Sequence, residues 1–252
     1  MPNKKLFRNC ILIVIFVALF TSACGSNDSK KEKSLPREVT SKEAQIFSQI
    51  LTNNKELKNA KYFIAPTGGK GSDFTAEGKV DWENSRSSMQ VTLKSLGEPD
   101  LSAISTTEIV YENYKGLDDI ERAQNLEPRK WATRIISKEL YGIDAVSQFV
   151  ISLTSNTPEN PLLLKQDGAQ FLGTQKSDGQ EVFLFKKKEG DIVYYVNKEG
   201  ILLGVKVKLE GFTQPMIIRF SDHGNGAVDI PEEKDVYSTD IIEGYFANRP
   251  KF

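Results

Sequence analysis

The 252-residue sequence has only two cysteines and one histidine. Cys10 lies in the apolar N-terminal segment described below, so export would leave Cys24 as the sole cysteine and no disulfide framework could form. His223 and one cysteine do not provide the ligands of an ordinary zinc site. The sequence therefore predicts neither a metal nor a cofactor.

Catalytic signatures are also lacking. His223 follows Ser221 and Asp222, but three adjacent residues cannot align as nucleophile, base and orienting acid. The glycines of residues 68–71 lack the spacing of a phosphate-binding loop. The acidic residues at 118–121 lack the register of a calcium loop. These segments are predicted to be turns and loops, and no enzymatic activity is expected.

The sequence has no excess of charge of one sign. Its formal net charge is -1. Removing residues 1–23, which hold three positive charges and no negative ones, would bring it to -4. No basic run with interleaved aromatic residues occurs, which argues against binding to nucleic acid. After residue 23, no apolar run is long enough to span a bilayer.

An export signal is present at the N-terminus. Residues 11–20 form an uncharged apolar run preceded by Lys4, Lys5 and Arg8, which is typical of a signal peptide over residues 1–23. The residues that follow, Thr-Ser-Ala-Cys at 21–24, resemble a bacterial lipobox. This resemblance implies that Cys24 receives a diacylglyceryl thioether and becomes the first residue of the mature protein. The alternative is an uncleaved anchor helix.

The next segment, residues 24–39, is polar, charged and without a period, which predicts a flexible tether. Stable anchoring generally takes two acyl chains, so a doubly acylated Cys24 would hold the protein on the membrane. The expected location is the outer face of the cytoplasmic membrane.

Residues 40–236 predict a single domain with two helices among many strands. The T-x-x-E pattern of Thr40 to Glu43 is a capping box, and the apolar spacing after it predicts a helix of about 17 residues. A second amphipathic helix is predicted over 143–153, and Pro161 is expected to keep the following residues out of a helix. The tail, residues 237–252, has no clear period.

Two-residue alternation and turn dipeptides predict the strands. Their expected ranges are 61–66, 74–82, 87–93, 106–111, 131–136, 171–175, 181–186, 192–197, 201–209, 216–220 and 227–230. The predicted fold class is α+β, with a large curled antiparallel sheet of about eight to eleven strands. This half-barrel would carry the amphipathic helices on its concave face and leave a cavity or groove there.

The order of these elements and several short motifs resemble the LppX/LprG group of actinobacterial lipoproteins, which share a half-barrel fold with the LolA and LolB carriers. The motifs are Gly-Ala-Gln-Phe-Leu-Gly at 168–173, Asp-Gly at 178–179, and residues 194–200 and 218–224. The resemblance covers roughly residues 40–236. It implies an anchored protein that binds acyl chains of a lipid or lipoglycan in an apolar cavity and carries or presents them in the cell envelope.

Apolar side chains on two strands and the second helix form the candidate acyl site, because burial is what holds an apolar ligand. The candidates are Met89, Val91, Leu93, Phe149, Val150, Leu153, Val205 and Val207. The alternative is that the same side chains pack together as a dry core.

Two functions remain open. The first is a monomeric, membrane-anchored lipid-binding or lipid-transfer protein. The second is an anchored docking subunit for an envelope transporter or assembly enzyme, without a lipid ligand.

Overall fold

The computed structural model describes residues 35–67, 74–93, 99–114, 117, 125–136, 142–177 and 179–237. All described residues belong to one compact unit that begins at Leu35. The predicted signal, Cys24 and most of the predicted tether and tail lie outside the described residues. In the described part, no helix is long and apolar enough to cross a membrane.

The strands are β1 (Arg37–Glu38), β2 (Asn59–Pro66), β3 (Phe74–Asp81), β4 (Arg86–Leu93), β5 (Pro99–Ser105), β6 (Ile109–Tyr114), β7 (Trp131–Ile135), β8 (Gln170–Ser177), β9 (Gln180–Lys186), β10 (Val193–Val196), β11 (Leu202–Val207), β12 (Met216–Ser221) and β13 (Val236–Tyr237). The helices are α2 (Ser41–Ser48), α3 (Ile50–Leu57), α5 (Ile143–Ser152), α6 (Pro161–Gln166) and the 3-10 turn η2 (Glu233–Asp235).

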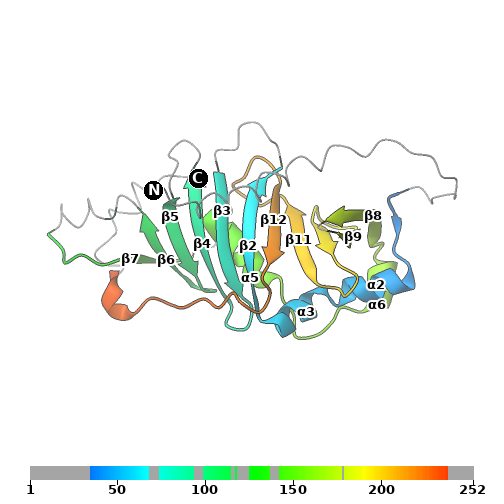
Figure 1. The fold of residues 1–252 in the computed structure, drawn as a ribbon, viewed down its shortest axis with the longest axis horizontal. Coiled ribbons are helices and arrows are strands. Elements are labelled where there is room, and N and C mark those ends of the chain that lie inside the picture. The colour runs from blue at the N-terminus through cyan, green and yellow to red at the C-terminus, as the bar shows by residue number, and fades with distance from the viewer. Residues whose placement is uncertain are drawn as a thin grey trace, which may run out of the picture. The chain divides into compact units, whose positions relative to one another are not determined.

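All of these strands belong to one unclosed sheet (Figure 1). Its order is β1-β8-β9-β10-β11-β12-β2-β3-β4-β5-β6-β7-β13, which makes it 13-stranded, with β1 and β13 at its two edges. Neighbouring strands are antiparallel except β13, which runs parallel to β7. The predicted large antiparallel sheet with few helices is confirmed, with more strands than the sequence indicated.

One face of the sheet carries a continuous apolar row. Residues directly opposite each other on paired strands point to the same face, so the register places buried side chains side by side across nine neighbouring strands. These are Phe171, Phe185, Tyr194, Val205, Ile218, Ile64, Ala76, Val91 and Leu101. The helices pack on this face, with α5 against β3, β4 and β5 and α3 against β2 and β11.

The N-terminal helical segment begins as predicted but is interrupted. The Thr40 hydroxyl accepts from the Glu43 amide and the Glu43 carboxylate accepts from the Thr40 amide, which completes the capping box. Two eight-residue helices follow, separated at Gln49, so the single long helix of the sequence prediction is wrong. The buried stripe nevertheless continues from Phe47 to Ile50, so both helices cover the same core.

The strand predicted at 106–111 overlaps β6, which begins at Ile109, and the structure adds β5 before it to form a hairpin. Thr106 forms the turn, because its hydroxyl accepts from the amides of Glu108 and Ile109. Such side-chain turns compete with strand pairing and are difficult to distinguish from strand residues by alternation alone. The serine-containing strand β5 was therefore missed.

Pro161 begins a helix rather than preventing one. It occupies the first turn of α6, where the missing amide hydrogen costs nothing, and the Asn160 side chain caps the helix by accepting from the Leu162 amide at 2.9 Å. The prediction of a non-helical segment after Pro161 is wrong.

Residues 227–230 do not form the predicted strand. They belong to a segment that runs from β12 across the strand ends to β13. Gly226 packs so closely on Ala60 that a Cβ at Gly226 would lie 2.6 Å from the Ala60 carbonyl oxygen. Beyond it, Val228 is buried and its carbonyl accepts from Arg86.

Candidate functional site

The apolar layer between the sheet and the helices contains most of the residues predicted for the acyl site. Six of them are buried members of one cluster, and Phe149 is partly buried against it. The six are Met89 and Val91 on β4, Val150 on α5, Leu153 just after α5, and Val205 and Val207 on β11. Leu93 is the last residue of β4 and lies opposite Phe74 of β3 in the strand register. The structure does not describe its side chain.

A group of aromatic rings in this layer was not among the predicted site residues. Phe47 of α2 stacks on Phe185 of β9, with ring centroids 5.0 Å apart, and meets the edge of Tyr194 at 5.3 Å. Phe171 and Phe183 flank Phe185 at 5.8 and 6.3 Å. Burial raises the pKa of Tyr194 to about 12, so this phenol is neutral at ordinary pH. Alternation within residues 181–186 and 192–197 was visible in the sequence, but the register that joins these rings was not.

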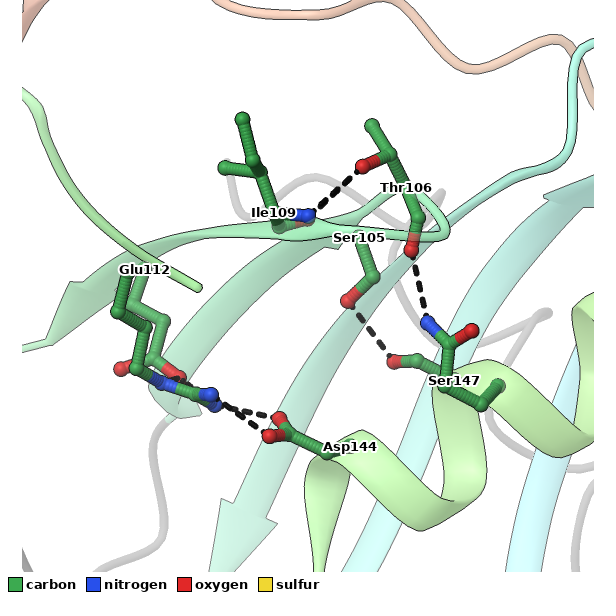
Figure 2. Close-up of polar contacts among 8 residues, drawn as sticks. Ser105, Thr106, Ile109, Glu112, Asp144 and Ser147 are labelled. Atoms are coloured by element: carbon green, nitrogen blue, oxygen red, sulfur yellow. Dashed lines mark hydrogen bonds and ion pairs between the residues drawn. The ribbon is translucent and has the colours of Figure 1, made fainter. Parts of the chain in front are cut away.

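Helix α5 is connected to the sheet by a buried ion cluster (Figure 2). Arg134 of β7 donates to the Glu112 carboxylate of β6 at 2.6 Å and to the Asp144 carboxylate of α5 at 2.6 Å. The side chains of Arg134, Glu112 and Asp144 are 13%, 0% and 5% exposed. Burial alone would lower the pKa of Arg134, but hydrogen bonds and charge from Asp144 and Glu112 raise it instead. The guanidinium is therefore charged, and it holds the start of α5 against β6 and β7.

Further polar contacts hold the middle and the end of α5. The hydroxyls of Ser105 and Ser147 are 3.0 Å apart and buried, and the Gln148 amide donates to the Thr106 carbonyl at 2.7 Å (Figure 2). At the other end, the Trp82 indole donates to the Val150 carbonyl at 2.9 Å. Between these contacts the helix meets the sheet through apolar side chains. Helix α5 is thus held by polar contacts near its start, middle and end, and it packs on the sheet through apolar side chains between them.

A second feature lies on the opposite face of the sheet. Residues that alternate with the apolar row form a depression of about 550 Å³ across β2 to β7. Its lining includes polar side chains such as Gln90, Ser102 and Asn113, three lysines at 61, 79 and 130, and the acidic Glu77. Lys61 is paired with Asp222 at 2.7 Å. This depression was not expected from the sequence, because it is formed jointly by strands β2 to β7 and depends on their register.

Of the residues set aside as catalytic candidates, His223 and Asp222 have separate partners, while residues 68–71 and 118–121 lie outside the described residues. His223 contacts the Leu202 carbonyl at 3.1 Å, and burial lowers its pKa. Its neighbour Asp222 pairs with Lys61 instead. Over the described ranges, no group of three or more His, Cys, Asp or Glu residues is placed to hold a metal ion.

No protein-family model matches the chain, and no curated protein matches it in sequence. Among solved structures, the crystal structure of the LolA superfamily protein NE2245 from Nitrosomonas europaea is similar at 10% identity, covering 78% of this chain and 97% of that one. The TM-score is 0.31.

Proposed function

We propose that this protein is a membrane-anchored lipoprotein that binds the acyl chains of a lipid or lipoglycan between its sheet and its helices, and carries or presents that lipid in the cell envelope. The continuous apolar row that faces α2, α3 and α5 is the observation that carries the proposal. An acylated Cys24 would hold the protein on the outer face of the cytoplasmic membrane. The resemblance found in the sequence implies the same role.

The proposed binding requires α5 to move away from the sheet, because side chains fill the layer beneath it in this structure. The sheet is unclosed and its strands pair without α5, so the helix can separate while the strand ladder stays intact. Burial contributes about 0.8 kcal/mol per methylene, so roughly a dozen buried methylenes contribute about 10 kcal/mol. A net hydrogen bond contributes about 1 kcal/mol, so an acyl chain can outweigh several of the contacts that hold α5.

Lipid extraction tests the proposal. The chain from residue 25 onward, exported without its anchor and purified without detergent, is extracted with organic solvent and analysed by mass spectrometry. We expect a defined set of acyl lipids in near-stoichiometric amount. Replacing Val205 with Lys should reduce the amount of lipid that co-purifies, because a charge would then lie in the apolar layer.

Ile135→Lys is the matched control, because Ile135 is 77% exposed and lies outside the apolar cluster. This variant should retain its lipid. The proposal would be abandoned if the unsubstituted chain co-purifies with no lipid and takes up none that is added.

The second candidate is an anchored accessory subunit of an envelope transporter or assembly enzyme. The depression on the opposite face favours it, because Gln90, Ser102 and Asn113 point polar groups into a space of about 550 Å³. A photo-reactive cross-linker at Gln90 should then capture one discrete envelope protein in cells, while the same cross-linker at the exposed Glu181 should not. Equal capture from both positions would argue against this role.

A further inference from the structure

Helix α6 presents two leucines to solvent. Leu162 and Leu163 are 67% and 53% exposed, while Leu164 is buried. The helix packs on α2 through its buried side. Two adjacent large apolar side chains on a short helix are unusual at a purely solvated surface, and exposed apolar groups of this kind mark contact surfaces.

The described chain begins at the same edge of the sheet (Figure 1). Strand β1 pairs with β8, which starts shortly after α6 ends, and the Val39 amide donates to the Ala169 carbonyl at 3.1 Å. Lys165 of α6 donates to the Ser41 hydroxyl at the start of α2. Leu35, which precedes β1, is 50% exposed and lies beside Gly173 of β8. Three exposed leucines therefore belong to the edge where the N-terminal segment joins the domain.

We propose that this edge, defined by Leu35, Leu162 and Leu163, docks on the surface of the lipid bilayer. The inference rests on the anchor at Cys24 that belongs to the proposed function. Residues 24 to 35 span at most about 40 Å when fully extended. The anchor is therefore joined to the domain at this edge, and the tether is short, while the β13 edge lies at the other end of the strand order.

Charge around α6 indicates which kind of bilayer contact is formed. A polar depression beside the helix is lined by Glu159, Asp167 and Glu189 and by Lys187 and Lys188. Lys187 pairs with Glu159 at 2.8 Å, so the local charge is close to balanced. Attraction to anionic headgroups is then weak, and the leucines enter the interface by apolar burial, to a depth of about 5–10 Å.

Tryptophan quenching by brominated lipids tests this docking. The mature chain from Cys24, which contains the whole compact unit Leu35–Phe252, is coupled through its Cys24 thiol to a maleimide lipid in phosphatidylcholine vesicles. Cys24 is its sole thiol because Cys10 lies in the removed segment. In the Leu163→Trp variant, bromine on the upper acyl carbons should quench the new tryptophan strongly. The native Trp82 and Trp131 are 0% and 9% exposed and contribute little to the change.

Ile135→Trp is the matched control, because Ile135 is an exposed apolar residue on β7, next to the β13 edge. It should remain unquenched, and adding phosphatidylglycerol should not change either result. Absence of quenching at Leu163, or equal quenching at Ile135, would overturn the proposal. If circular dichroism shows that Leu163→Trp disturbs folding, Leu162→Trp gives the same readout.

The anchor is attached chemically in this experiment, so the result does not depend on processing in the cell. The mass of the N-terminal peptide of the cellular protein tests acylation of Cys24 separately. Failure of that acylation would count against the proposed function and leave the quenching result unchanged.

Discussion

Arg134 is the buried cation that pairs with two buried carboxylates. Glu112 and Asp144 are almost fully buried, and both accept hydrogen bonds from its guanidinium. A buried charge without a partner is far less stable than a buried pair, because the protein interior cannot replace its hydration. Removing one charged member of the cluster should therefore reduce the stability of the fold more than neutralising all three.

We expect Arg134→Met to reduce the free energy of unfolding by about 3–5 kcal/mol, because Glu112 and Asp144 would lose their common partner. Urea denaturation at neutral pH measures the change. The triple variant with Glu112→Gln and Asp144→Asn added is the control and should lose less stability. Equal losses in both would show that the packing of the arginine side chain, rather than its charge, is what matters.

Glu43 makes the stability of the α2 cap depend on pH. Hydrogen bonds from Arg37, which lies 2.7 Å from the carboxylate, and from the Thr40 amide lower the pKa of Glu43 from 4.5 to about 2. Between about pH 2 and pH 4.5 the unfolded chain therefore binds more protons than the folded protein. The stabilisation by ionised Glu43 is complete above about pH 5 and is lost as the pH falls toward 2.

The difference in unfolding free energy between the unsubstituted protein and Glu43→Gln should consequently be largest near neutral pH and should shrink as the pH falls. Urea midpoints measured from pH 6 to pH 2.5 provide the comparison. A difference that stays constant across this range would contradict the assignment.

At the scale of elements, α5 is the part of the apolar layer that must move if a lipid is to enter. It is bordered by residues 137–141, which lie outside the described part, and by the loop that follows Leu153. The buried hydroxyl contact between Ser105 on β5 and Ser147 on α5 provides a place at which the helix can be cross-linked to the sheet.

We predict that the Ser105→Cys/Ser147→Cys variant, made in a chain with Cys24→Ser, binds lipid when reduced and loses binding when a disulfide holds α5 on β5. Uptake of a fluorescent fatty acid measures this, and Ser147→Cys alone is the control that cannot form the cross-link. Unchanged uptake by the oxidised double variant would show that the acyl chain enters without displacement of α5.

At the scale of the whole molecule, the sheet joins two groups of side chains into one core. The aromatic rings around Phe185 lie under α2, and the cluster beneath α5 lies around β3 to β5, but the apolar row runs without interruption from one to the other. A continuous core of this kind predicts that the domain unfolds in one cooperative transition.

Phe185→Ala tests this cooperativity. Phe185 is 0% exposed and lies on β9, whereas Trp82 follows β3 and Trp131 is on β7. We expect a loss of about 3–5 kcal/mol and an equal shift of the urea midpoint measured by tryptophan fluorescence and by circular dichroism. If the two halves of the sheet unfolded separately, the urea midpoint measured by tryptophan fluorescence would stay unchanged in Phe185→Ala, which would contradict a single transition.

The sequence by itself determined features that repeat within a single element. The capping box at Thr40, the helical period over 143–153 and the alternation in the hairpins at 171–207 depend on neighbouring residues, so they could be predicted without knowledge of the fold. The buried state of Met89, Val91, Val205 and Val207 follows from the same alternation.

The tertiary structure alone decided which elements meet. The pairing of β13 with β7 brings Tyr237 to Ala132, and the ion cluster joins Arg134 to residues 22 and 10 positions away in the chain. The depression on the polar face, the aromatic group and the leucines of the β1 edge depend on strand order and register as well. These features arise where separate segments meet, and no local sequence pattern records the free energy of such contacts. The same two-residue alternation is compatible with many strand pairings, and only the packing of the whole core selects one of them.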